Sequence, residues 1–310
     1  MHPAYSVIFF TAASGAGYGL LGLMGVLNAS GYLPSDKWFG LTGFLLALGL
    51  ITFGLLASTF HLGHPERAWR ALTQWRSSWL SREGVLAVLT YMPAGLFAIG
   101  WVFLDQTAGI FMVMGVLSAI GAALTVYCTS MIYASLKSIP AWTNELVSPL
   151  YMVLGLATGG LILDVLLHIF DTPIAGVSVL CILALITGAL LKRRYWQEID
   201  AAPRETDLAS ATGLGQIGKV RVLDNPHTSK NYLQQEMGYR VARKHALKLR
   251  RIATVALFIL PIILLGLALA FPAIALAATV LAVVAACVGI VTERWLFFAE
   301  AKHVVMTYYE

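Results

Sequence analysis

The chain has 310 residues, of which 58% are hydrophobic and 12% charged, and its mean hydropathy is +0.76. A soluble domain carries about 25% charged residues, so this composition excludes a soluble globular enzyme, a disordered chain and a nucleic-acid-binding domain. The formal net charge of +5 comes from 21 Lys and Arg against 16 Asp and Glu. In so apolar a chain, the positions of these charges along the sequence are more informative about the protein than its net charge.

Eight apolar runs approach or exceed the roughly 20 residues that a helix needs to cross a bilayer. Apolar residues are continuous along each run and do not alternate, which excludes the strands of a membrane barrel. The sequence therefore predicts an all-α integral membrane protein, with one membrane domain over residues 1–310. The expected spans are Tyr5–Asn28, Trp38–Phe60, Gly84–Leu104, Gly109–Leu136, Ser148–Phe170, Ile174–Leu191, Ile252–Ala270 and Ala273–Phe298.

Basic residues are distributed unevenly between the two sides of these spans. Nineteen of the 21 Lys and Arg fall on the side of the N-terminus, only Lys37 falls on the other, and Arg294 lies near a helix end. The positive-inside rule then predicts that both termini are cytoplasmic, in a cell inner membrane. The first residues lack the basic region of a cleavable signal, so we expect the first span to be retained.

Small residues recur at helical spacing within several spans. Such pairs let two helix backbones approach closely, so they predict tight helix packing and no chemistry. The pairs are Gly15 with Gly19, Gly155 with Gly159, and Ala119 with Ala123.

Residues 192–251 form a long segment between the sixth and seventh spans, and the predicted orientation makes it cytoplasmic. Its end, Tyr232–Arg251, carries apolar residues on one helical face and basic residues elsewhere, which predicts an amphipathic helix at the membrane surface. Two interpretations remain open: the helix lies on anionic membrane lipid, or it docks a soluble partner. The glycines of Gly213–Gly218 match a dinucleotide-binding pattern, but this segment has no room for the sheet which that pattern requires.

Two ionisable residues flank the loop between the second and third predicted helices. His61 lies at the end of the second span, and Glu83 lies at the start of the third. Charges at membrane depth are costly and therefore mark candidate sites. Because one loop joins these helices, we expect them to be neighbours and His61 and Glu83 to face one pocket.

Four interpretations of this cluster compete. A quinone pocket needs a hydrogen-bond donor and a group that exchanges protons, and a His with a partly buried carboxyl supplies both. A metal site is disfavoured because His61 and His64 have no third ligand nearby, and haem because the histidines are not deep in facing helices. The fourth interpretation is purely structural: capping and salt bridges among Glu66, Arg67, Arg82 and Glu83.

Two further polar groups lie in the spans. Asp164 and His168 are four residues apart on one helical face, which favours an interfacial ion pair and leaves a proton exit as the alternative. Tyr127, Ser130 and Tyr133 lie along the cytoplasmic half of the fourth span, where an aromatic belt is the default and a quinone contact the sharper hypothesis. The three cysteines, Cys128, Cys181 and Cys287, are far apart in sequence and suggest neither disulfides nor an iron–sulfur cluster.

Three stretches of the sequence resemble the DMSO reductase anchor subunit family, which is related to polysulfide-reductase-type anchors. The first and most specific is STFHLGHPERAWRALTQWRSSWLSREG (Ser58–Gly84). The others are MIYASLKSIPAW (Met131–Trp142) and PHTSKNYLQQEMGYRVARKHALKLR (Pro226–Arg250). Together with the eight spans, they extend the resemblance over most of the chain.

The resemblance implies a subunit that anchors a molybdopterin catalytic subunit and a ferredoxin-like subunit with four iron–sulfur clusters. Such anchors bind quinone or quinol, either ubiquinone or menaquinone, and contain no haem. The family's His in the H-L-G motif and its Glu early in the third helix act at the quinol site, and these positions match His61 and Glu83. Arg67, Arg82 and Tyr133 are weaker candidates for positioning the quinone.

The predicted orientation bears on the reaction that this resemblance implies. In this family the partners sit on the side of the termini, which the charge count places in the cytoplasm. That arrangement favours the anchor of a quinone-dependent sulfite dehydrogenase over an anchor that oxidises quinol for an exported DMSO reductase. Two rivals remain: a purely structural anchor, and a small-molecule transporter, which would favour charges near the bilayer midplane and inverted repeats that we do not see.

Overall fold

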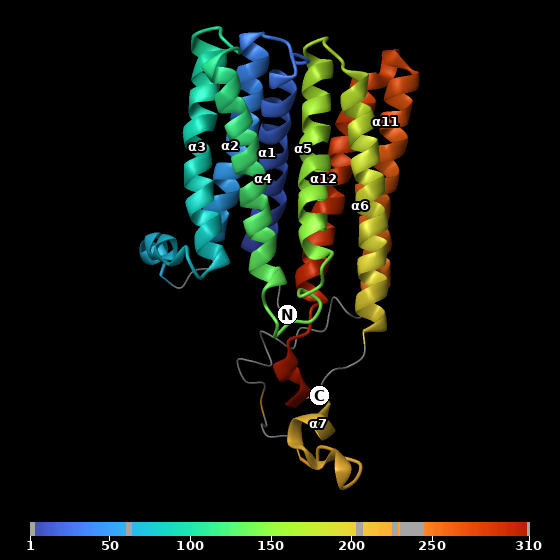
Figure 1. Cartoon of the computed structure of the whole chain (residues 1–310). Coiled ribbons are helices and arrows are strands. Elements are labelled where there is room, and N and C mark those ends of the chain that lie inside the picture. The colour runs from blue at the N-terminus through green and yellow to red at the C-terminus, as the bar shows by residue number, and fades with distance from the viewer. Residues whose placement is uncertain (1–3, 60–63, 203–206, 225–228, 230–244, 309–310) are drawn as a thin grey trace.

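Eight long helices make up the body of the protein (Figure 1). The computed structural model describes residues 4–59, 64–202, 207–224, 229 and 245–308. Within these residues there is no strand, and eight helices are long and apolar enough to cross a membrane. They are α1 (Tyr5–Ala29), α2 (Lys37–Thr59), α3 (Trp79–Phe103), α4 (Ile110–Ala134), α5 (Val147–Ile169), α6 (Ala175–Ala201), the continuous run α10–η3–α11 (Ala246–Ala270) and α12 (Ala275–Ala299).

The all-helical fold and the eight helices that are long and apolar enough to cross a membrane confirm the prediction, but three boundaries were wrong: the starts of α3 and α10 and the end of α6. Helix α3 begins at Trp79, five residues before the predicted start, because the Ser78 side chain caps it by accepting the backbone N–H of Ser81. Helix α6 continues to Ala201, ten residues beyond the predicted end. The stretch 192–201, expected in the loop, is therefore helical.

Most of the predicted amphipathic helix at Tyr232–Arg251 lies outside the described residues. Its last residues, from Ala246, form the first turns of α10 and so belong to the seventh spanning helix. The segment between α6 and α10 contains two short helices, α7 (Leu208–Thr212) and η2 (Leu214–Gln216). Gly213 ends α7 with φ +70°, and no strand precedes it in the described residues, so the glycine pattern caps a helix here.

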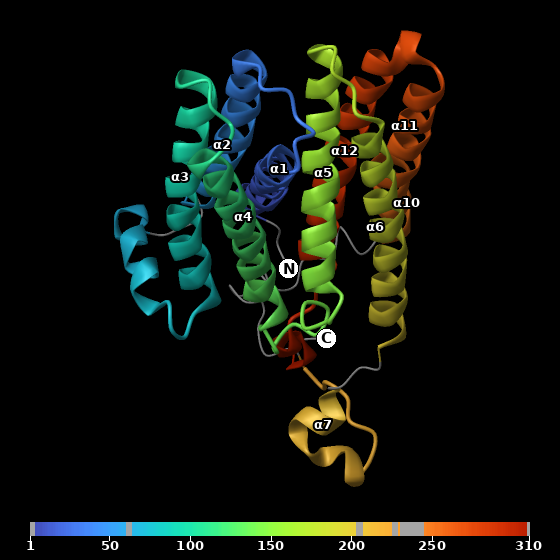
Figure 2. The same ribbon diagram turned by 45° about the horizontal axis from the view of Figure 1, so that its top comes forward.

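Helices α1 and α5 lie at the centre of the bundle. In their most apolar stretches 61% and 72% of the residues are buried, against 28–44% in the other six helices. Figures 1 and 2 agree that α2, α3 and α4 lie on one side of this pair, and α6, α10–α11 and α12 on the other. The bundle thus has two halves that meet along α1 and α5.

The contact between α1 and α5 depends on glycine. A Cβ atom built on Gly19 would collide with the backbone of Gly155, and one on Gly159 would collide with the backbone of Gly19 and Leu20. Side chains at these positions would therefore push the central helices apart. This confirms the close packing predicted from the spacing of the small residues.

Large apolar side chains cover the outer surface of the helices, as expected for a surface that faces lipid. Exposed examples from four helices are Phe53, Met92, Leu190 and Val284. Helix α1 begins and α12 ends at the same end of the bundle, where η1 (Pro65–Gln74), α7 and η5 (Val304–Tyr308) also lie (Figure 1). We refer to it as the terminal end.

Candidate functional site

Glu83 is buried in the second turn of α3, near the terminal end, with 4% of its surface exposed. The hydroxyl of Thr129 on α4 donates a hydrogen bond to Glu83 Oε1. Among the described residues, no Lys, Arg or His forms an ion pair with this carboxyl. Glu83 can therefore gain or lose a proton without leaving a cation unpaired, which suits a proton-exchanging group.

Arg82 points to the turn before α3. Its guanidinium donates to the backbone carbonyls of Trp75 at 3.0 Å and Arg76 at 2.7 Å, and it lies 4.2 Å from the centre of the Trp79 ring. Consecutive residues of a helix project in different directions. Arg82 therefore hydrogen-bonds to this turn, while Glu83 faces the interior of the bundle.

The surface helix η1 packs against the start of α3, outside the bundle (Figure 1). A Cβ atom on Gly84 would lie 2.7 Å from Leu72 of η1, so this helix covers α3 right beside Glu83. Arg67 lies on η1, is exposed, and has its Nε 3.8 Å from Glu66 Oε1. His61, the other main candidate, lies outside the described residues.

Tyr133, on α4, is buried in an aromatic cluster near the terminal end. Its ring lies 5.3 Å from Trp142, 5.9 Å from Tyr151, 5.6 Å from Phe297 and 5.2 Å from Phe298, between ring centres. Tyr127, one of the other hydroxyl candidates, is 41% exposed, as expected for an aromatic belt.

A second buried cluster of charges, which sequence reasoning missed, lies in the other half of the bundle. Lys192 of α6 donates from Nζ to Glu293 Oε1 of α12, and both side chains are only 1% exposed. Arg294 Nε lies 3.3 Å from Glu293 Oε2, and its side chain is 3% exposed. One carboxylate thus lies between two cations, and the three side chains carry one net positive charge.

The sequence contained a signal for this cluster. Glu293 and Arg294 are two adjacent charges inside the last predicted span, which is costly for a helix that faces lipid and therefore points to the bundle interior. Lys192 directly follows the predicted end of the sixth span and was assigned to the loop. The longer α6 places it inside the bundle.

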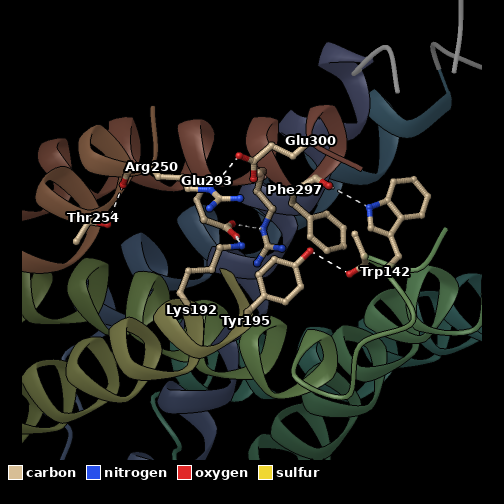
Figure 3. A network of polar contacts seen from close by, with 10 residues as sticks. Trp142, Lys192, Tyr195, Arg250, Thr254, Glu293, Phe297 and Glu300 are labelled. Atoms are coloured by element: carbon tan, nitrogen blue, oxygen red, sulfur yellow. Dashed lines mark hydrogen bonds and ion pairs between the residues drawn. The ribbon is translucent and has the colours of Figure 1, made fainter. Parts of the chain in front are cut away.

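A second set of polar contacts lies beside this cluster, toward the terminal end (Figure 3). Arg250 of α10 donates to Glu300 at 2.9 Å and to Asp200 of α6 at 2.6 and 3.0 Å. Burial raises the pKa of the Glu300 carboxyl, and Arg250 opposes that shift. Asp200 is 58% exposed, so this second set of contacts reaches the surface.

The loop between α4 and α5 is fastened to the same half. Trp142 donates from its indole N–H to the Phe297 carbonyl at 3.0 Å, and the Tyr195 hydroxyl donates to the Ala141 carbonyl at 3.0 Å. The ends of α6 and α12 therefore hold the loop in place (Figure 3).

Asp164 and His168 lie on α5 at the end opposite to the terminal end. Asp164 is fully buried and accepts from the Ser178 hydroxyl of α6, at 2.9 Å on Oδ1 and 3.0 Å on Oδ2. His168 Nδ1 lies 3.7 Å from Asp164 Oδ1. The shared face is confirmed, and the carboxyl is a buried contact between two helices instead of an interfacial one.

The structure gives no described group of three His, Cys, Asp or Glu side chains that is placed to hold a metal ion. All three cysteines are free: Cys128 and Cys181 are buried, whereas Cys287 is exposed on the outer face of α12.

Comparisons with known proteins agree with this architecture. The family model described as DMSO reductase anchor subunit (DmsC) matches residues 1–299. The sequence is 31% identical to the C subunit of the sulfite dehydrogenase of Allochromatium vinosum, over 100% of this chain and 99% of that protein. It is 28% identical to the C component of the anaerobic dimethyl sulfoxide reductase of Haemophilus influenzae, over 46% of this chain and 54% of that protein. The protein therefore belongs to the DMSO reductase anchor subunit family, as a multi-pass membrane protein.

Proposed function

We propose that this chain is the quinone-reactive anchor of a molybdopterin oxidoreductase complex of the sulfite:quinone type. The full-length likeness to a sulfite dehydrogenase subunit supports this choice, while the half-length match to a DMSO reductase component supports quinol oxidation as the alternative. The partners are a molybdopterin catalytic subunit and a ferredoxin-like subunit with four iron–sulfur clusters. They dock at the terminal end, which the excess of basic residues assigns to the cytoplasmic face of the inner membrane.

The observation that carries this proposal is that Glu83 is buried and forms no ion pair with a described cation. A quinone takes up two electrons and two protons when it becomes a quinol. The partner's clusters supply or accept the electrons, so this chain has to manage the protons. A buried carboxyl that bonds to a hydroxyl, and to no described cation, can do so at little electrostatic cost.

The polar groups at Glu83 match the chemical needs of a quinone head group. The carboxyl of Glu83 and the hydroxyl of Thr129 offer a proton-exchanging group beside a hydrogen-bonding group. The pocket on the inner side of Thr129 has a volume of about 10 Å³, far below what a ring needs. We therefore assign the ring to the α2–α3 side, next to the segment that contains His61.

In this assignment Glu83 exchanges protons and His61 donates a hydrogen bond to a quinone oxygen. Arg67, Arg82 and Tyr133 have weaker roles in positioning. Arg67 and Arg82 lie near the junction of η1 and α3, and Tyr133 lies in the aromatic cluster, four residues after Thr129 on α4. Membrane lipid surrounds the remaining outer surface.

The first test is purification of the tagged chain from native membranes in a mild detergent. Molybdenum and iron should co-purify, and the preparation should reduce quinone with sulfite as donor. Oxidation of quinol with DMSO instead would favour the alternative. A chain that purifies alone and without metal in several detergents would contradict the anchor proposal and favour a transporter.

The second test is Glu83→Gln in that complex. We expect quinone-linked turnover to fall by about 100-fold or more, since general acid–base groups contribute about 10² to 10⁴. Turnover with an artificial electron acceptor, which bypasses this subunit, should be unchanged. Glu145→Gln, at an exposed carboxyl of the same end, is the matched control. Full quinone activity in Glu83→Gln would refute the site.

A further inference from the structure

A small pocket lies between Glu83 and the second cluster of charges. It is bounded by α1, α4, α5 and α12, and Thr129, the hydrogen-bond partner of Glu83, forms part of its wall. Its volume of about 10 Å³ is close to that of one water position. Its polar lining consists of Thr11, Ser14, Thr129, Tyr151, Thr158 and Arg294.

Two of these side chains bring unsatisfied polar atoms to the pocket. Tyr151 and Arg294 are 4% and 3% exposed, and neither the Tyr151 hydroxyl nor Arg294 Nε has a hydrogen-bond partner in the described structure. They lie together, with the guanidinium carbon 3.8 Å from the centre of the Tyr151 ring. Arg294 Nε keeps its ion-pair contact with Glu293 Oε2, but a buried hydroxyl without a partner, such as that of Tyr151, is costly, so a polar pocket beside it favours bound water.

The charges on the two sides of the pocket are complementary. Beyond Arg294, the Lys192–Glu293–Arg294 cluster has one positive charge in excess. Beyond Thr129, Glu83 has no described cationic partner. A proton that leaves or reaches Glu83 changes the charge on one side only, and the fixed positive charge on the other side stabilises the carboxylate form.

We propose that this pocket holds water that passes protons to and from Glu83 through the hydroxyls of Thr129 and Tyr151, while the Lys192–Glu293–Arg294 cluster keeps its charge. The protons enter from the terminal end, near which Thr11, Tyr151 and Arg294 lie in their helices. Each proton that Glu83 gives up is replaced by one proton delivered along the water, so two pass for each quinone reduced. The proposal deepens the proposed function and depends on Glu83 acting there.

Tyr151→Phe is the sharpest variant because it removes only the hydroxyl. Arg294→Met is the second variant, and it leaves Lys192 and Glu293 as a balanced pair, which favours folding. Tyr195→Phe is the matched control, since its buried hydroxyl bonds to the Ala141 carbonyl and does not line the pocket. All are measured in the whole complex, with the artificial acceptor as a check on the partners.

We expect both pocket variants to slow quinone-linked turnover by roughly tenfold and to increase its solvent deuterium isotope effect. A small weak acid such as formate should restore part of the rate, which it would not do for a misplaced helix. Tyr195→Phe should match the wild type in rate and isotope effect. Wild-type rate and isotope effect in both pocket variants would overturn the proposal.

A readout independent of turnover is hydroxyl-radical footprinting of the wild-type complex, in which radicals form from bound water. Tyr151 should gain oxygen faster than Tyr195, although both are buried. An unmodified Tyr151 would show a dry pocket and overturn the route while leaving Glu83 in place. Loss of turnover in Glu83→Gln with normal pocket variants would likewise separate the two proposals.

Discussion

Glu83 and Glu293 are both buried carboxylates near the terminal end, yet their surroundings differ. Glu83, in the half formed by α2, α3 and α4, accepts a hydrogen bond from a threonine hydroxyl. Glu293, in the half formed by α6, α10–α11 and α12, lies between Lys192 and Arg294. Protonating Glu83 disturbs one hydrogen bond, whereas protonating Glu293 leaves two cations buried together.

This difference separates a group that can change charge from one that must keep it. Sequence position alone does not distinguish them, since each lies close to a helix end. The partners decide the role: a neutral hydroxyl tolerates both protonation states, and two cations tolerate only one. The comparison leads to the following tests.

The largest effect is expected for Glu293→Gln. Breaking a buried ion pair by removing one partner costs about 3–5 kcal/mol, because it leaves uncompensated charge inside the protein. The same change at Glu83 should cost less than about 1 kcal/mol, since glutamine still accepts from Thr129. Unfolding of the purified variants by heat in detergent measures both. Equal losses would remove the distinction between the two carboxylates.

The junction of the two halves is tested by Gly159→Leu. Its side chain would meet the backbone of Gly19 and Leu20, so we expect a loss of about 1–3 kcal/mol or more and a lower yield of folded protein. Gly22→Leu is the control, because a Cβ there meets nothing within 4 Å. If both variants behave alike, close contact of α1 and α5 does not hold the halves together.

Thr129→Val sharpens the description of the Glu83 half. It removes the hydroxyl that donates to Glu83, and we expect quinone-linked turnover to fall by roughly tenfold with little change in unfolding temperature. In the control, Thr90→Val, the lost hydroxyl donates only to the Leu86 carbonyl of its own helix, at 2.7 Å. Equal turnover in the two variants would mean that the hydroxyl of Thr129 does not act on Glu83.

The smallest effect is expected at the exposed ion pair between Asp200 and Arg250. Asp200 is 58% exposed, so Asp200→Asn should lower stability by about 0.2–1 kcal/mol, and less at high salt. Measuring Glu293→Gln in the same unfolding assay compares the loss of stability at this exposed ion pair with the loss at the buried one. A loss at Asp200 as large as that at Glu293 would show that exposure does not screen this ion pair.

Much of the fold was predictable from sequence because it depends on local properties. Hydropathy located all eight helices, and the glycine spacing indicated the contact between α1 and α5. The errors arose where a helix continues through polar residues. The run from Lys192 to Ala201 reads as loop by hydropathy, but Lys192 and Tyr195 pack inside the bundle. The start of α3 depends on a serine cap that hydropathy does not register.

The sequence by itself determined that this protein has eight helices long and apolar enough to cross a membrane, belongs to the anchor subunit family and carries a candidate carboxyl at Glu83. These conclusions follow from residue types and spacings along the chain. Only the tertiary structure decided which charges meet. Lys192 and Glu293 are 101 residues apart, and their pairing depends on how α6 packs against α12. In a medium of low polarity, such a pairing decides whether a buried charge is fixed or free to change.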